Sequence, residues 1–208
     1  MTAVLLLACA GPATDVPEET DPPADDTVET DSPADTDAPE GARDIFLVTE
    51  HTGSMADDLD AVKSQAPDLL ALLGEHDRLG VVTDGADGCV VSGILDRDSD
   101  PQVLRNSLNG QEGPLSGNLI EATRRALWAT EASCNTGMDR PGASTLVVIL
   151  SDQSGVASDL GDLAEFEPVI WWLGDTACTG AYADAAGATG GQVVCPWAPD
   201  GLKTVLTP

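Results

Sequence analysis

Oxygen-bearing side chains follow two of the most apolar runs in the sequence. Glu50, Thr52 and Ser54 come after the run 45–49, and Asp152 comes shortly after the run 145–150. Carboxylate and hydroxyl oxygens are the ligands that hard divalent cations such as Mg²⁺ and Ca²⁺ prefer. These two segments are therefore the first place to look for a ligand site, provided that the fold brings them together.

The same region contains the residue types of a serine hydrolase. Ser54, His51 and Asp152 would form a catalytic triad if they met at one end of a sheet. The nucleophile of many such enzymes lies in a G-x-S-x-G turn, whereas Met55 and Ala56 follow Ser54. The sequence contains no phosphate-binding loop, zinc-ligand spacing or C-x-x-C pair. We therefore expect no enzymatic activity, and a serine hydrolase is the least favoured alternative.

Two further segments carry clustered carboxylates. The segment 96–100 (DRDSD) alternates carboxylates, but Pro101 and Ser107 stand where a calcium-binding EF-hand has Gly and Glu. We therefore predict a solvated loop there. Asp84 follows the run 79–83 and would approach the same sheet end as Glu50, although the Gly-rich segment 84–88 favours a plain turn.

The elements that must position these residues alternate between apolar strands and amphipathic helices. Helices are predicted at 56–74, where Pro67 should kink or split the helix, and at 117–131. Unbroken apolar strands between helices predict an α/β fold of three layers, doubly wound, with a mostly parallel central sheet and helices on both faces. Ligands of such sheets bind beyond the carboxyl ends of the strands. The predicted strands are 45–49, 79–83, 145–150, 169–173 and 192–195, with a further edge strand at 89–95.

These strand ends resemble those of the von Willebrand factor type A (vWA) family. The segment DIFLVTEHTGSMADDLDAVK is similar to the first strand and helix of that family, and TLVVILSDQ is similar to a later strand that ends in Asp. The resemblance covers most of residues 44–206. It implies a vWA or Rossmann-like fold and a metal-ion-dependent adhesion site, in which a divalent cation bridges to an acidic group of a partner.

The resemblance also implies which residues would hold the cation. Glu50 takes a position that is Asp in the family, Thr52 takes a Ser position, and Ser54 and Asp152 match the pattern. The middle-loop Thr has no counterpart, and Ser116 is the nearest hydroxyl, so the site is degenerate. The extra methylene of Glu50 moves its carboxylate by about 1.5 Å, which suits the looser geometry of Ca²⁺ better than that of Mg²⁺.

The N-terminal residues predict export and a lipid anchor. Residues 1–8 read as a signal-peptide fragment, and residues 6–9 (LLAC) resemble the lipobox of bacterial lipoproteins, in which the cysteine, here Cys9, is lipidated. The apolar run is too short to span a bilayer, which takes about 20 residues. Because Ala10 rather than Asp follows Cys9, the resemblance implies the outer membrane or the cell surface.

Residues 9–43 are predicted to form a disordered acidic linker. Eleven of the 36 Asp and Glu residues and six of the 14 prolines lie in residues 12–42. Such a segment buries too little apolar surface to fold, so we predict a tether to a domain at 44–208. The net charge of −27 disfavours nucleic acid as a partner. Residues 44–208 carry 25 acidic and 8 basic residues, so an acidic partner would need a cation as intermediary.

The other four cysteines indicate an oxidising compartment. Cys89, Cys134, Cys178 and Cys195 allow three sets of two disulfides. Cys178 and Cys195 flank the last helix–strand unit, and Cys89 and Cys134 lie in loops near the middle of the domain. This placement favours the pairs 178–195 and 89–134.

Together these features predict a lipid-anchored binding or adhesion module of the bacterial cell envelope. Its partner would be a protein or an envelope component, bound through Mg²⁺ or Ca²⁺ if the site is occupied. The alternative is a metal-independent structural or interaction domain of an envelope assembly.

Overall fold

The computed structural model of the protein describes residues 38–83, 90, 92–109, 118–128, 138, 140–155, 167–174 and 178–207, all of which belong to one compact unit, Asp35–Pro208. None of the helices in these ranges has the length and apolar character needed to cross a bilayer. The elements, in chain order, are β1 (Arg43–Thr49), the 3₁₀ helix η1 (Gly53–Met55), α1 (Ala56–Ser64), α2 (Ala66–Ala71), β2 (Arg78–Thr83), α3 (Pro101–Ser107), α4 (Leu119–Trp128), β3 (Ser144–Ser151), β4 (Val169–Gly174), α5 (Ala181–Ala188), β5 (Val193–Val194) and α6 (Pro199–Leu206).

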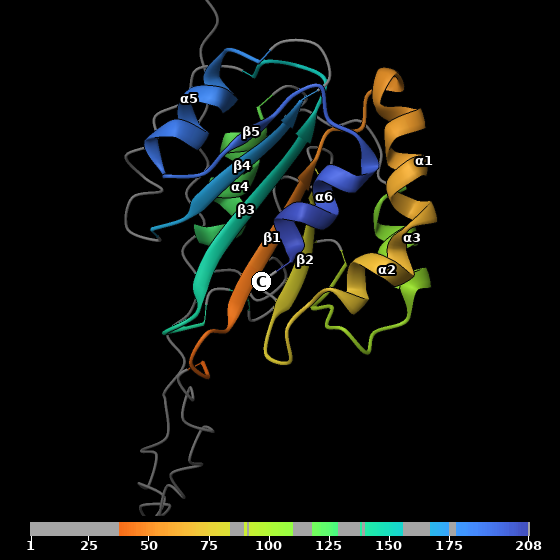
Figure 1. Ribbon diagram of the computed structural model, residues 1–208, viewed down its shortest axis with the longest axis vertical. Helices are drawn as coiled ribbons and strands as arrows, with labels where there is room; N and C mark the ends of the chain where they lie inside the picture. Colours follow the sequence, from red (N-terminus) through yellow and green to blue (C-terminus); the bar gives the residue numbers. More distant parts are fainter. Residues whose placement is uncertain are drawn as a thin grey trace, which may run out of the picture. The chain divides into compact units, whose positions relative to one another are not determined.

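The five strands form one parallel sheet in the order β2-β1-β3-β4-β5 (Figure 1). This arrangement confirms the predicted α/β fold with a parallel central sheet. β1 lies between β2 and β3, and Thr49 stands opposite Thr83 on one side and Leu150 on the other. The strand order reverses at β1 and β3, so their carboxyl ends form the switch point at which ligands of such sheets bind.

Each face of the sheet packs against helices through its own apolar core. Side chains alternate along β1, so that Ile45 and Leu47 face one core while Phe46 and Val48 face the other. The first core includes residues of α1, α2, α3 and α6, and the second includes residues of α4 and α5, which Figure 1 shows on opposite sides of the sheet. All four β1 side chains are at most 2% exposed. Burial of one such side chain stabilises the fold by about 1.5–3 kcal/mol, so β1 anchors both layers.

The predicted helix at 56–74 is split, as Pro67 indicated. α1 ends at Ser64, Gln65 leaves the helical conformation, and Pro67 lies in the first turn of α2. A proline is tolerated there because the first N–H groups of a helix have no partner within the helix. The break lets α1 run on from the loop after β1 while α2 turns toward β2.

The predicted edge strand at 89–95 is wrong for the residues described there. Val90 and Leu95 form only isolated antiparallel bridges to β2. Between them, Gly93 has a φ of +67°, which no regular strand allows. The hydroxyl of Ser92 accepts the Val81 N–H of β2 at 2.9 Å, in the place of a strand carbonyl. This segment therefore protects the outer edge of β2 without adding a strand.

The DRDSD segment forms a turn that begins α3, a helix that the sequence analysis did not predict. The Asp100 side chain caps this helix by accepting the Gln102 N–H at 2.8 Å, and Pro101 occupies its first position. Asp96 accepts hydrogen bonds from the Asp98 N–H at 3.0 Å and from the Ser99 hydroxyl at 2.8 Å. These carboxylates thus organise a local turn.

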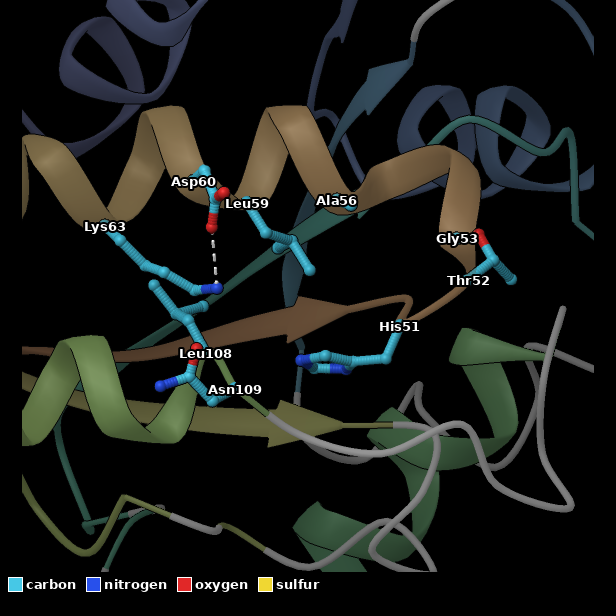
Figure 2. Close-up of a pocket in the computed structure, with 9 residues that line it drawn as sticks. All are labelled: His51, Thr52, Gly53, Ala56, Leu59, Asp60, Lys63, Leu108 and Asn109. Atoms are coloured by element: carbon cyan, nitrogen blue, oxygen red, sulfur yellow. Dashed lines mark hydrogen bonds and ion pairs between the residues drawn. The ribbon is translucent and has the colours of Figure 1, made fainter.

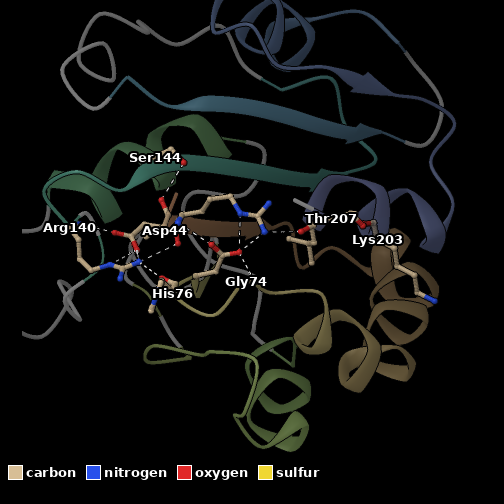
Figure 3. A network of polar contacts seen from close by, with 11 residues as sticks. Asp44, Gly74, His76, Arg140, Ser144, Lys203 and Thr207 are labelled. Carbon is tan, nitrogen blue, oxygen red and sulfur yellow. Dashed lines mark hydrogen bonds and ion pairs between the residues drawn. The ribbon is translucent and has the colours of Figure 1, made fainter. Parts of the chain in front are cut away.

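Two ion pairs close the amino end of the sheet (Figure 3). Asp44 is fully buried and accepts hydrogen bonds from Arg140 Nη2 at 2.7 Å and Nε at 2.9 Å. Asp77 is 4% exposed and pairs with the Arg43 guanidinium, which also donates to the Leu206 carbonyl at 2.8 Å. Arg43 therefore joins the start of β1 to the end of α6.

The pKa of Asp77 is lowered by its partners. Burial by itself raises the pKa of this carboxyl, but hydrogen bonds from Arg43 and the Gly74 amide, together with the Arg43 charge, bring the pKa below its ordinary value. The Arg43–Asp77 pair therefore contributes stability above about pH 4, and this contribution is lost as the pH falls through the folded-state pKa.

We predict that Asp77→Asn lowers stability at pH 7 and weakens the acid dependence of stability, because the variant has no carboxylate to protonate at this position. Urea unfolding midpoints measured between about pH 6 and pH 2 test this. Asp200→Asn is the control, since Asp200 forms only a solvent-exposed pair with Lys203 at 3.6 Å. Wild-type acid dependence in Asp77→Asn would contradict the assignment.

Candidate functional site

The predicted site residues lie at the switch point of the sheet. Glu50 directly follows β1, and its backbone N–H donates to the Leu150 carbonyl of β3 at 3.1 Å. Because β1 and β3 are neighbours in register, Glu50 and Ser151 leave the sheet side by side. The fold therefore brings together the loops that carry Glu50, Thr52 and Ser54 on one side and Asp152 on the other.

Glu50 is turned into the protein and binds the loop after β3. Its side chain is fully buried, and its carboxylate accepts hydrogen bonds from the Ser151 hydroxyl and the Gln153 side-chain amide. The Gln153 backbone N–H in turn donates to Ser151 Oγ at 3.0 Å. The sequence analysis assigned Glu50 a ligand role and did not identify Ser151 and Gln153 as its partners.

The missed partners had a detectable signal in the sequence. Members of the family that this sequence resembles commonly have Gly after the late Asp, whereas this chain has Gln153. The two departures from the pattern, Glu50 and Gln153, contact each other in the structure. The longer acid reaches an amide that the usual Gly would not supply.

Thr52 and Ser54 present two hydroxyls on the surface of the β1 loop. Their side-chain oxygens are 2.9 Å apart and share a hydrogen bond. They flank Gly53 at the start of η1, where the Met55 N–H donates to the Thr52 carbonyl at 3.1 Å. The Met55 side chain is fully buried and fixes this turn on the core below. In the described region the Ser54 hydroxyl thus pairs with Thr52, and not with His51 as a hydrolase triad would require.

Asp152 has an oxygen that the described residues leave unsatisfied. Its Oδ1 is buried and has no hydrogen-bond partner among them. The backbone beside it is held firmly, because Trp172 Nε1 donates to the Ser151 carbonyl at 3.3 Å. Gly155 follows with a φ of +79° and lies against the Tyr182 ring, where a larger residue would clash. A buried carboxylate oxygen normally has a donor or a cation beside it.

One further predicted pair is confirmed, and the other predicted site residues lie outside the described ranges. The predicted disulfide between Cys178 and Cys195 is present, with a Cα–Cα distance of 5.6 Å. Among the described residues, no cluster of three or more His, Cys, Asp or Glu side chains could hold a metal. Outside the described ranges lie Cys9, the segment 84–88, Cys89, Ser116, Cys134 and nearly all of the predicted linker at 9–43.

Solved structures of other proteins share this fold. Proximal thread matrix protein 1 from the mussel byssus matches with a TM-score of 0.52 and 13% identity over 82% of this chain and 48% of its own. A von Willebrand factor type A structure from Catenulispora acidiphila matches with a TM-score of 0.51 and 13% identity over 80% of this chain and 41% of its own. This chain thus spans less than half the length of either protein.

Two further structures complete the comparison. An aerotolerance-related membrane protein from Bacteroides fragilis matches with a TM-score of 0.53 and 13% identity over 78% of this chain and 96% of its own. Another structure of the mussel protein, with zinc in its MIDAS motif, matches with a TM-score of 0.51 and 12% identity over 82% of this chain and 48% of its own. No family model matches the sequence, and no curated protein matches it. The structural likeness confirms the expected vWA fold.

We predict that Ser151→Ala destabilises the fold by about 1–3 kcal/mol, because it leaves the buried Glu50 carboxylate without one of its donors. Urea unfolding at pH 7 measures the loss. Ser144→Ala is the matched control at the opposite end of β3, where the side chain is exposed and the hydroxyl is 3.5 Å from the Ala42 carbonyl. Equal stability of the two variants would show that Ser151 does not hold Glu50.

Proposed function

We propose that this chain, which has the fold of vWA domains, is a lipid-anchored binding module of the bacterial cell envelope. The loops after β1 and β3 form its binding face. A divalent cation held between these loops contributes to capture of a protein or envelope partner.

The buried, unsatisfied oxygen of Asp152 carries the proposal of a cation. It lies directly after β3, next to the strand whose loop presents the hydroxyls of Thr52 and Ser54. One carboxylate and two hydroxyls are a suitable oxygen set for Ca²⁺ or Mg²⁺, with water completing the shell. Asp152, Thr52 and Ser54 would hold the ion, and Ser116 remains a predicted further ligand. A bound cation supplies positive charge and an open position for an oxygen of the partner.

Glu50 stabilises the backbone around this site. Its hydrogen bonds to Ser151 and Gln153 fix the backbone on both sides of Asp152, as outer-shell partners of metal ligands commonly do. We therefore propose an indirect role for Glu50 in place of the direct ligation that the sequence predicted.

The start of β1 and the proposed binding face lie at opposite ends of the sheet. β1 begins at Arg43, where the predicted linker ends, and the seven residues of this strand extend about 23 Å to the binding face. Before β1, the Ala38 N–H donates to the Pro141 carbonyl at 2.7 Å. The end of α6 lies at the same pole, because Arg43 binds the Leu206 carbonyl. The loops after β1 and β3 therefore lie at the opposite end of the sheet from Arg43.

Two structures of the same fold support the proposal. The mussel protein holds zinc in its MIDAS motif, which shows that this fold can position a divalent cation. The Bacteroides fragilis protein is described as a membrane protein. The negative charge of residues 44–208 adds a physical reason for the cation, since an acidic group would otherwise be repelled.

We predict that isothermal titration of the full chain shows Ca²⁺ or Mg²⁺ binding, and that Ser54→Ala combined with Asp152→Ala removes it. The double variant deletes the unsatisfied carboxylate and one of the paired hydroxyls. Asp98→Ala combined with Ser107→Ala is the matched control, because it removes one carboxylate and one hydroxyl around α3. Unchanged binding in the site variant would refute the cation assignment.

The alternative is a metal-independent interaction domain. It is favoured by the hydrogen bonds of Glu50, which join the two loops without an ion. Under this alternative, thermal melts in EDTA and in Ca²⁺ coincide, whereas a specific cation raises the melting temperature. These thermal melts therefore separate the two functions.

We predict that Cys9 carries the lipid. The chain expressed in a bacterium should fractionate with membranes and incorporate labelled palmitate, and Cys9→Ala should lose the label because the Cys9 thiol is the group to which the lipid is attached. Cys178→Ala combined with Cys195→Ala is the control for loss of thiols at the described disulfide. Membrane association and labelling that persist in Cys9→Ala would exclude this anchor.

A further inference from the structure

The two sides of the proposed binding face are supported in different ways. On the β1 side, Thr52 precedes η1, and Figure 2 shows its side chain pointing away from the His51 ring. The buried Met55 side chain fixes that turn. On the β3 side, residues 152–155, which we call the Asp152 segment, contain no helix or strand. Contacts with other parts of the chain must therefore hold this segment in place.

Tyr182, in the first turn of α5, packs against the Asp152 segment. Its backbone N–H donates to the Ser154 carbonyl at 3.3 Å, and its ring lies against Gly155. Gly155 has a φ of +79°, and a Cβ placed there would come within 2.6 Å of three ring carbons. α5 therefore holds the end of the segment both by a hydrogen bond and by close packing.

The other end of the Asp152 segment is linked to Tyr182 through Trp172. Trp172 Nε1 donates to the Ser151 carbonyl at 3.3 Å. The Trp172 and Tyr182 rings meet edge to face with their centroids 5.9 Å apart, a geometry in which aromatic rings attract each other. Both side chains are fully buried. Asp152 thus lies between two backbone carbonyls, those of Ser151 and Ser154, that are each bound by one member of this aromatic pair.

The hydroxyl of Tyr182 is held from another direction, by α4. Its Oη accepts the Leu119 backbone N–H at 3.0 Å in a buried hydrogen bond. Leu119 is the first residue of α4, and the first N–H groups of a helix have no acceptor within the helix. A hydroxyl 63 residues away in sequence supplies that acceptor. Tyr182 therefore ties the start of α4 to the Asp152 segment.

We propose that Tyr182 is a positioning residue of the binding face, whose hydroxyl holds the Asp152 segment in one conformation, ready for the cation. The χ2 torsion of an aromatic side chain has broad minima, so packing alone leaves the ring some freedom. The hydrogen bond to Leu119 removes that freedom and fixes the surface on which Gly155 lies. The inference rests on the proposed function, because it names a residue that sets the geometry of the same site.

The first test is isothermal titration of the full chain with Ca²⁺ and with Mg²⁺, at a temperature where every variant is folded. Tyr182→Phe keeps the ring and removes only the hydroxyl. We expect it to weaken cation binding about tenfold, the lower end of the effect that outer-shell partners have on metal affinity. Thermal melts check that the variant retains the fold.

Thr189→Val is the matched control. Thr189 directly follows α5, and its hydroxyl also accepts the backbone N–H of a distant residue, Ile170, at 3.0 Å. Ile170 is the second residue of β4, at the end of the sheet opposite the binding face. This variant should lower the melting temperature and leave cation affinity unchanged. A purely structural role of the Tyr182 hydroxyl would give the same pattern in Tyr182→Phe.

The second test measures hydrogen exchange of backbone amides by NMR in EDTA, and so needs no bound ion. The Gln153 N–H donates to Ser151 Oγ at 3.0 Å and reports on the Asp152 segment. Tyr182→Phe should speed exchange of the Gln153 amide as well as that of Leu119, because local opening of the segment becomes easier. Thr189→Val should leave Gln153 exchange at its wild-type rate.

Two outcomes would overturn the inference. One is wild-type exchange of the Gln153 amide in Tyr182→Phe, and the other is a cation affinity of this variant equal to that of the wild type. A wild-type chain that binds neither cation refutes the proposed cation site alone. The exchange rates in EDTA then decide whether Tyr182 positions the Asp152 segment.

Discussion

The hydrogen bonding of β1 on both sides is the interaction on which the rest of the structure depends. Every residue from Asp44 to Thr49 is in register with β2 and with β3. The strand also sends alternate side chains into two separate cores. Because this register leaves no freedom at the strand ends, Glu50 and Ser151 emerge together. The position of the proposed binding face therefore follows directly from parallel pairing at the centre of the sheet.

The buried carboxyl groups at the two ends of the sheet have different kinds of partners. At the amino end, Asp44 and Asp77 each have an arginine partner, so these buried carboxylates have the hydrogen bonds and the opposite charge that they need. At the carboxyl end, Glu50 is held by neutral donors, and Asp152 has an oxygen that no described group satisfies. A satisfied network is typical of structural support, while an unsatisfied oxygen on a rigid frame is typical of a ligand site.

Two departures from the vWA pattern act as a pair. The longer side chain at Glu50 would misplace a metal ligand if it changed alone. Gln153 meets that carboxylate and converts it into a connection between the loops after β1 and β3. In the proposed cation site, the ligands are Asp152 and the hydroxyls of Thr52 and Ser54.

The sequence by itself determined the layers of this protein. Unbroken apolar runs predicted the five strands of the sheet, and helical spacing predicted the helices α1, α2 and α4. These patterns are visible in the sequence alone, because a buried face is apolar whichever element it packs against. Only the tertiary structure decided the interruption at Gly93, the short helix α3 and the inward turn of Glu50. Each depends on contacts with residues distant in sequence or on a local cap too short to give a periodic signal.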